Sequence, residues 1–75
     1  MTALPVISGR EVVKALGRAG FRVIRQRGSH VRLEKRIEDG LIKLTVPLHK
    51  RLKKGTLRRI IKDSGLTVQE FNRLR

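Results

Sequence analysis

The chain of 75 residues contains no cysteine, no tryptophan and no tyrosine, and only two phenylalanines. Without cysteine it can form neither a disulfide framework nor a thiolate metal site. So few aromatic residues disfavour folds that stack bases on exposed rings, such as the RRM and OB types. No apolar run approaches the ~18 residues of a membrane span, and the N-terminus lacks the pattern of a signal peptide. We therefore expect a cytoplasmic protein.

Acidic residues are also scarce, since six Asp and Glu stand against 19 Lys and Arg, for a net charge of +13. A merely solvated basic face normally has acidic residues mixed into it, so the imbalance favours a polyanionic partner, either a nucleic acid or an acidic protein. Membrane-surface binding is less favoured, because no stretch pairs a basic face with a bulky, aromatic-rich apolar face. Binding should therefore depend on phosphates and sugars, and no small-molecule ligand is expected.

The length allows one domain with a small core, which we expect to span residues 1–75. A first helix is predicted from about Gly9, because Ser8 and Glu11 have the spacing of a capping box, and Gly20 can supply the left-handed residue that ends it. Apolar residues recur at helical spacing on one face of this segment, namely Val12, Val13, Leu16 and Ala19.

After this helix the apolar residues alternate with polar ones, which predicts strands at residues 21–27, 30–35 and 41–47. The connections are short turns, at Gly28-Ser29 and at residues 38–40. In the first strand Phe21 and Val23 should share a face, although Ile24 blurs the alternation. Strands joined by such short connections must pair antiparallel, as a meander.

Two further helices are predicted after the third strand. Thr56 can cap a helix that continues to Gly65, and Thr67 with Glu70 forms a second capping box at the start of a short final helix. The resulting α-β-β-β-α order predicts a two-layer α+β domain, in which helices cover one face of an antiparallel three-stranded sheet.

A histidine follows the Gly28-Ser29 turn. If Val31 and Leu33 face the helices, the alternation places His30, Arg32 and Glu34 on the uncovered face, beside Lys43 and Thr45 of the neighbouring strand. His30 is then accessible and among cations. It could be a satisfied core histidine, a surface residue without a role, or a functional group. The alternation fits burial poorly and favours function.

The chemistry of that position suits RNA. A neutral imidazole within reach of a ribose 2′-OH can remove its proton as the oxygen attacks the adjacent phosphorus. Nearby Arg and Lys side chains and the backbone amides of Gly28 and Ser29 can stabilise the developing charge. We expect no metal and no cofactor, because the acidic residues are scattered, and His30 and His49 lack the spacing typical of metal ligands.

The candidate RNA-binding residues flank His30 and continue through the loop after the third strand. Arg58 and Arg59 on the following helix either extend this surface or are simply solvated. The candidates are Arg25, Arg27, Gly28, Ser29, Arg32, Lys43, Lys50, Arg51, Lys53 and Lys54.

The run "SGREVVKALGRAGFRVIRQRGSHVRLE", then "TVPLH", then "KGTLRRIIKDSGLTVQEF", resembles the HicA toxin family over about residues 4–72. The resemblance implies a fold like that of the double-stranded-RNA-binding domain. It also implies a metal-independent endoribonuclease that cleaves mRNA within a type II toxin-antitoxin system. The implied partner is a HicB-type antitoxin that covers the sheet face around His30.

Carried over by position, His30 is the histidine of the family's Gly-Ser-His motif and is implied to be catalytic. His49 matches the histidine after the Val-Pro pair, and three roles stay open for it: contacting RNA, donating a proton to the leaving oxygen, or positioning the loop. The chain departs from many relatives at Lys54, where they have proline, and its second hairpin, "KRIEDGL", is longer.

Two readings compete with a ribonuclease. A non-catalytic RNA-binding module of the same fold would use the cations alone, and would keep its function without His30. Architectural DNA binding is less favoured, because the sequence offers no clear reading helix or minor-groove wedge.

Overall fold

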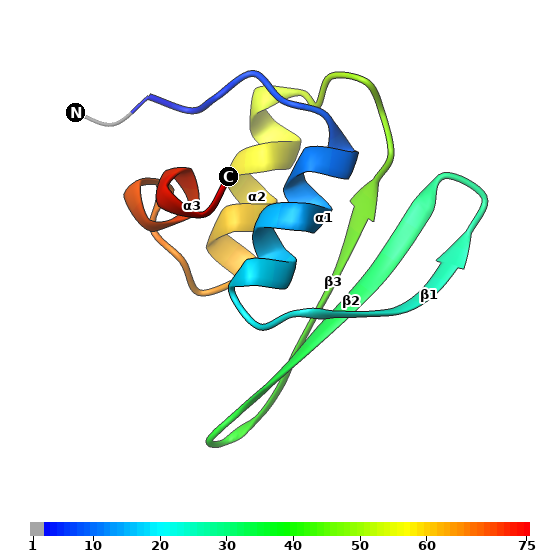
Figure 1. The fold of residues 1–75 in the computed structure, drawn as a ribbon, viewed down its shortest axis with the longest axis vertical. Coiled ribbons are helices and arrows are strands. Elements are labelled where there is room, and N and C mark those ends of the chain that lie inside the picture. The colour runs from blue at the N-terminus through cyan, green and yellow to red at the C-terminus, as the bar shows by residue number, and fades with distance from the viewer. Residues whose placement is uncertain (1–2) are drawn as a thin grey trace.

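The computed structural model describes residues 3–75 and has the predicted element order, so that only the first two residues of the predicted domain lie outside it. Figure 1 shows the strands as one sheet with the helices gathered on one side of it. This is the predicted α+β architecture, with a short third helix at the end. The elements are α1 (Gly9–Arg18), β1 (Arg22–Arg27), β2 (His30–Ile37), β3 (Gly40–Pro47), α2 (Lys54–Asp63) and α3 (Val68–Leu74).

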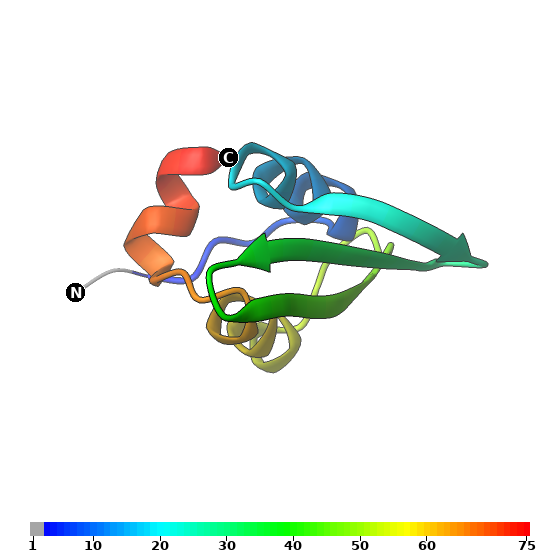
Figure 2. The ribbon, with the colours of Figure 1, turned by 90° about the horizontal axis from the view of Figure 1, so that it is seen from below.

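The three strands pair antiparallel in the order β1-β2-β3, as the short connections require. β2 is therefore the central strand, and β1 and β3 are the two edges of the sheet. Figure 2 shows α3 at the end of the molecule away from the β1–β2 turn. No helix within residues 3–75 is long and apolar enough to cross a membrane.

Both predicted capping boxes are present. The Ser8 hydroxyl accepts from the backbone N–H of Glu11, and the Glu11 carboxylate accepts from the backbone N–H of Ser8. Thr67 and Glu70 make the same reciprocal pair at α3. The backbone N–H and the hydroxyl of Ser8 lower the pKa of Glu11, and those of Thr67 lower the pKa of Glu70. Gly20, with φ 100°, follows the end of α1 as predicted.

The predicted cap at Thr56 is wrong, because α2 is capped three residues earlier and begins at Lys54. Its N-cap is Lys53, which makes no side-chain capping bond, and Thr56 lies in the first turn. The helix start is determined by tertiary packing: Leu52 is buried and its N–H donates to the carbonyl of Ile7 at 3.0 Å. The preference of threonine for caps is therefore overridden by the anchoring of the preceding loop.

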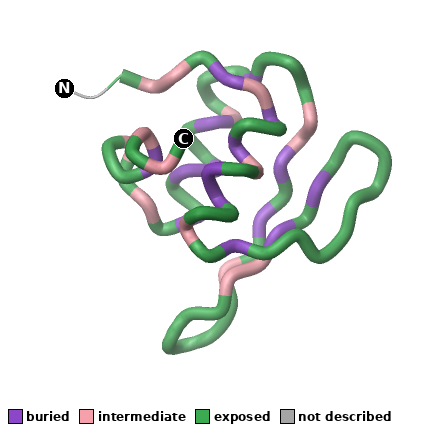
Figure 3. Tube along the Cα trace, viewed as in Figure 1, coloured by how far each residue is buried: buried purple, intermediate pink, exposed green. Residues whose placement is uncertain are grey.

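The hydrophobic core lies between the helices and one face of the sheet, where Figure 3 shows the buried residues concentrated. Burial of apolar surface there is the main term that stabilises the fold. The two sheet turns lie outside this region and are exposed. The sheet contributes Val31, Leu33, Leu44 and Val46, and the helices contribute Val12, Ala15, Leu16, Leu57, Ile60, Ile61 and Phe71.

Val23 pairs with the buried Leu33 and therefore lies on the helix side of the sheet, the face predicted for it and Phe21, but it is not buried there. Phe21 is buried just before β1, but Val23 is 55% exposed, and the register shifts between Val23 and Arg25, which leaves Ile24 as an extra residue. Such a bulge bends an edge strand and re-aims its side chains. Figure 1 shows β1 running away from the helices towards the β1–β2 turn. Val23 and Ile24 therefore remain more than half exposed.

Candidate active site

His30 is the first residue of β2, and its side chain is exposed. Its register partners are Arg27 on β1 and Pro47 on β3. Because Val31 beside it is buried against the helices, alternation directs His30 to the opposite surface of the sheet. We call this surface the open face; it carries Arg25, Arg27, His30, Arg32, Glu34, Lys43 and Thr45.

His30 lies in a shallow hollow of about 180 Å³ on the open face. Three guanidinium groups surround the imidazole, so the hollow combines fixed positive charge with a group that can accept or donate a proton. A phosphate that enters it meets several N–H donors at once. This His30 hollow is lined by Arg25, Arg27, His30, Arg32 and Thr45.

The turn before His30 is held from both sides. Gly28 has φ 57°, a conformation that L side chains rarely adopt, which explains glycine at this position. The Gln26 side chain donates to the Gly28 carbonyl at 3.1 Å, and the Leu48 N–H donates to the Ser29 carbonyl at 2.6 Å. The turn that precedes the imidazole is thereby tied to β1 and to the chain after β3.

The second candidate histidine, His49, is exposed and does not line the His30 hollow. Its backbone carbonyl accepts from the N–H of Gly9 at 2.9 Å, which fixes this segment to the start of α1. A Cβ on Gly9 would clash with the Pro47 carbonyl oxygen, so the helix and the segment pack backbone to backbone. In the part of the chain described, the two histidines therefore share no hollow.

Four predicted RNA-binding residues lie in the loop and first helical turn after β3, which we call the basic loop. All four are exposed, and none of them lines the His30 hollow. A helix N-terminus favours negative charge, so lysines at that end of α2 do not stabilise it. The residues of the basic loop are Lys50, Arg51, Lys53 and Lys54.

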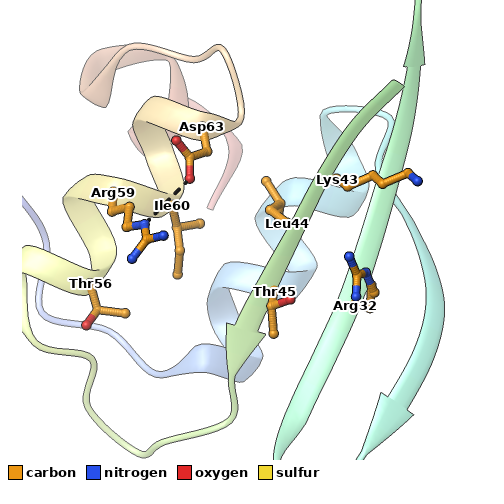
Figure 4. Close-up of a pocket in the computed structure, with 8 residues that line it drawn as sticks. All are labelled: Arg32, Lys43, Leu44, Thr45, Thr56, Arg59, Ile60 and Asp63. Atoms are coloured by element: carbon orange, nitrogen blue, oxygen red, sulfur yellow. Dashed lines mark ion pairs between the residues drawn. The ribbon is translucent and has the colours of Figure 1, made fainter. Parts of the chain in front are cut away.

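Lys43 lies beside the open-face residues of β2, as predicted, although it is not adjacent to His30 itself. Its register partner is Glu34, whereas Thr45 is opposite Arg32 and reaches the His30 hollow. Lys43 instead lines a second, larger hollow between β3 and α2 (Figure 4). Nothing in the sequence marked Thr56 or Asp63 as candidates, because their place in this hollow depends on how α2 packs against the sheet. Its lining residues are Arg32, Lys43, Leu44, Thr45, Thr56, Arg59, Ile60 and Asp63.

The cations of the open face have few acidic neighbours. Within residues 3–75, the one ion pair within 4.0 Å joins Arg59 Nε and Asp63 Oδ2 at 3.9 Å. Glu11 and Glu70 are engaged in the capping boxes. The described residues hold no cluster of three or more His, Asp or Glu side chains that suits a metal ion. The open face is thus a cationic surface whose charges are available to a partner.

The molecule is thus a small α+β protein with an exposed histidine in a cationic hollow, and comparison with protein families agrees with this description. The model of the HicA toxin of bacterial toxin-antitoxin systems matches residues 9–66, well over half of the chain. The chain therefore belongs to the HicA toxin family, and its partner is an antitoxin. The comparison with curated proteins gives no match. The matched segment includes every candidate site residue, from Arg25 to Lys54.

Proposed function

We propose that this toxin is a metal-independent endoribonuclease that cleaves mRNA in the cytoplasm. The observation that carries the proposal is the His30 hollow, where one exposed imidazole is surrounded by three arginines that make no ion pair within the described residues. Family membership supports the proposal, since it makes the chain a toxin. Fold alone would not separate cleavage from binding.

In this mechanism the neutral imidazole of His30 removes the proton from a ribose 2′-OH. The 2′ oxygen attacks the adjacent phosphorus, and the bond from phosphorus to the 5′ oxygen breaks. The products are a 2′,3′-cyclic phosphate and a 5′-hydroxyl, once the leaving oxygen has gained a proton. The guanidinium groups of Arg25, Arg27 and Arg32 stabilise the negative charge that develops on the phosphoryl oxygens.

The leaving oxygen needs a proton donor, and His49 is one candidate. The geometry supports His30 as the base more strongly, because His49 lies outside the hollow and is held to α1 through its backbone. His49 and the basic loop are better placed to contact RNA on either side of the reacting phosphate. If His49→Ala cleaves as fast as wild type, a protonated His30 or solvent supplies the proton.

The open face is also the surface on which an antitoxin would inhibit the toxin. A HicB-like antitoxin with an acidic surface would cover the open face, where it meets unpaired cations and excludes RNA from His30. Inhibition would then require no conformational change at a distance, because the inhibitor occupies the site itself.

The test is cleavage of RNA by purified wild-type and His30→Ala proteins in EDTA, with the product ends identified. We expect cleavage by wild type with cyclic-phosphate and 5′-hydroxyl ends, and a loss of at least about 100-fold in His30→Ala, as is typical when a general base is removed. RNA affinity should be nearly unchanged, because the arginines remain.

Two results would contradict the proposal in different ways. Equal cleavage by both proteins would mean that His30 is not the catalyst. Equal binding with no cleavage by either would favour an RNA-binding module over an enzyme.

A further inference from the structure

The hollow between β3 and α2 has the size and composition of a ligand site. Its volume of about 370 Å³ falls within the roughly 300–1,000 Å³ of small-molecule and cofactor sites. Figure 4 shows Thr56, Arg59 and Asp63 on the α2 side, whereas Lys43 and Arg32 extend on the other side of β3. The hollow therefore follows the outer edge of β3, from the helix to the open face.

This hollow adjoins the His30 hollow, because Arg32 and Thr45 line both. Arg32 and Thr45 are register partners. Arg32 is also two positions along β2 from His30, which places the Cα atoms of His30 and Arg32 about 7 Å apart. An RNA strand with its reacting phosphate at His30 can thus place the neighbouring nucleotide over Thr45 at the edge of β3. As an edge strand, β3 also offers backbone groups that pair with no other strand.

The groups in the hollow match the parts of one nucleotide. Arg32, Lys43 and Arg59 supply cations for phosphate, and Thr45 and Thr56 supply hydroxyls. On the side that faces the core, Leu44 and Ile60 are only 7% and 4% exposed, so they offer a small apolar floor to the face of a base. No aromatic residue lines the hollow, so a base there is held by aliphatic contact and hydrogen bonds.

Asp63 is the unexpected member of this set, since a carboxylate repels a phosphodiester. It does little for α2, because it is the last residue of the helix, where the macrodipole favours cations. Its i,i+4 partner Arg59 precedes it, which is the less favourable order, and the side chains are 84% and 52% exposed. Neither helix stability nor phosphate binding explains a carboxylate here.

A carboxylate in an RNA-binding hollow accepts hydrogen bonds from N–H groups of a base. Adenine, guanine and cytosine each carry an exocyclic amino group. Uracil has carbonyl oxygens on both sides of its single N–H, and these repel a carboxylate. A carboxylate at the position of Asp63 would therefore favour amino-bearing bases over uracil.

We propose that the hollow between β3 and α2 binds the base of a nucleotide adjoining the cleaved bond, and that Asp63 selects adenine, guanine or cytosine over uracil at that position. The inference rests on the proposed ribonuclease function, because it names the substrate subsite beside His30.

The experiment uses short RNA–DNA chimeras with a single 2′-hydroxyl, in which the base on each side of the cleavable bond is varied in turn. Wild type should cleave amino-bearing substrates faster than uracil substrates at one flank by about tenfold, near the lower end of the roughly 5- to 140-fold that base contacts supply. Asp63→Asn should reduce that ratio to about twofold or less, because its amide can also donate to uracil. The matched control Asp39→Asn, in the exposed β2–β3 turn, should keep the wild-type ratio.

A binding series with uncleavable 2′-O-methyl RNA of the same sequences separates this inference from the ribonuclease proposal. If wild type never cleaves but binds amino-bearing RNA more tightly in a manner that depends on Asp63, the base subsite stands and the enzyme proposal fails. The subsite is contradicted if Asp63→Asn leaves the base preference intact or changes all rates equally. It is also contradicted if the variant alters antitoxin binding while base preference stays the same.

Discussion

The two faces of β2 are made of alternating residues of one strand, yet one face is packed in the core and the other is exposed to solvent. Val31 and Leu33 point to the helices and are at most 4% exposed. His30 and Arg32, one residue away in each case, point to solvent. The first pair stabilises the fold by burying apolar area, whereas nothing in the fold requires the second pair.

This difference shows where function can be located in a chain of this size. A residue on the helix side is explained by packing, and its replacement acts through the stability of the whole protein. A cation or histidine on the open face has no packing role, so under the proposed function its replacement should change RNA or antitoxin binding and leave the fold intact. A substitution on one face of β2 should therefore leave the property that belongs to the other face intact.

Leu33→Ala should have the largest effect. Leu33 is fully buried in the core, and truncation of a leucine at such a site costs about 2–5 kcal/mol of unfolding free energy. Urea denaturation followed by circular dichroism measures this. His30→Ala, on the open face, should change stability by no more than about 0.5 kcal/mol. Similar losses of unfolding free energy in both variants would mean that the open face also contributes to the stability of the fold.

Arg32→Gln should have an intermediate effect, which should appear in RNA binding and not in the stability of the fold. Arg32 lines both hollows, and the loss of one phosphate contact weakens binding for all sequences and lowers the slope of log affinity against log salt by about one. Binding titrations of uncleavable RNA at several salt concentrations measure the slope. Arg73→Gln on α3 is the control, and an equal change in slope there would argue against a localised binding surface.

Lys53→Ser should have the smallest effect. It should raise the stability of the fold and lower the affinity for RNA. A serine at this N-cap can accept a backbone hydrogen bond that lysine does not, which stabilises α2 by about 0.5–2 kcal/mol. RNA affinity should fall slightly, because one cation of the basic loop is lost. A thermal melt and an RNA titration on the same sample measure both changes. Lower stability in the serine variant would show that Lys53 contributes a packing interaction of its own.

Much of the fold could be predicted from the sequence, because local signals agree with the tertiary structure. The capping boxes at Ser8 and Thr67 are entirely local, and the alternation in β2 and β3 matches one buried and one open face. The start of α2 could not be predicted, because it depends on Leu52 being anchored to Ile7 far away in the sequence. The β1 bulge at Ile24 shows in the sequence only as an interruption of the alternation, which does not specify a shift of register.

The candidate site could be predicted only where its geometry follows from local sequence. Alternation is enough to place His30 and Arg32 on the open face. The distance of Lys43 from His30 depends on the register that the β2–β3 turn imposes, in which Ile37 pairs with Gly40. The hollow that contains Asp63 requires α2 to pack beside β3, and no sequence pattern within either element specifies that arrangement.

The central claim is that RNA binds the open face of the sheet, and the most direct test is to map the binding surface by NMR. Amide resonances of the toxin would be followed as uncleavable 2′-O-methyl RNA is added. The account predicts that the largest shifts occur at His30, Arg32 and Thr45, with α1 and α3 little affected. Shifts concentrated on α1 or α3, with no shifts at residues of the open face, would contradict the claim that RNA binds there.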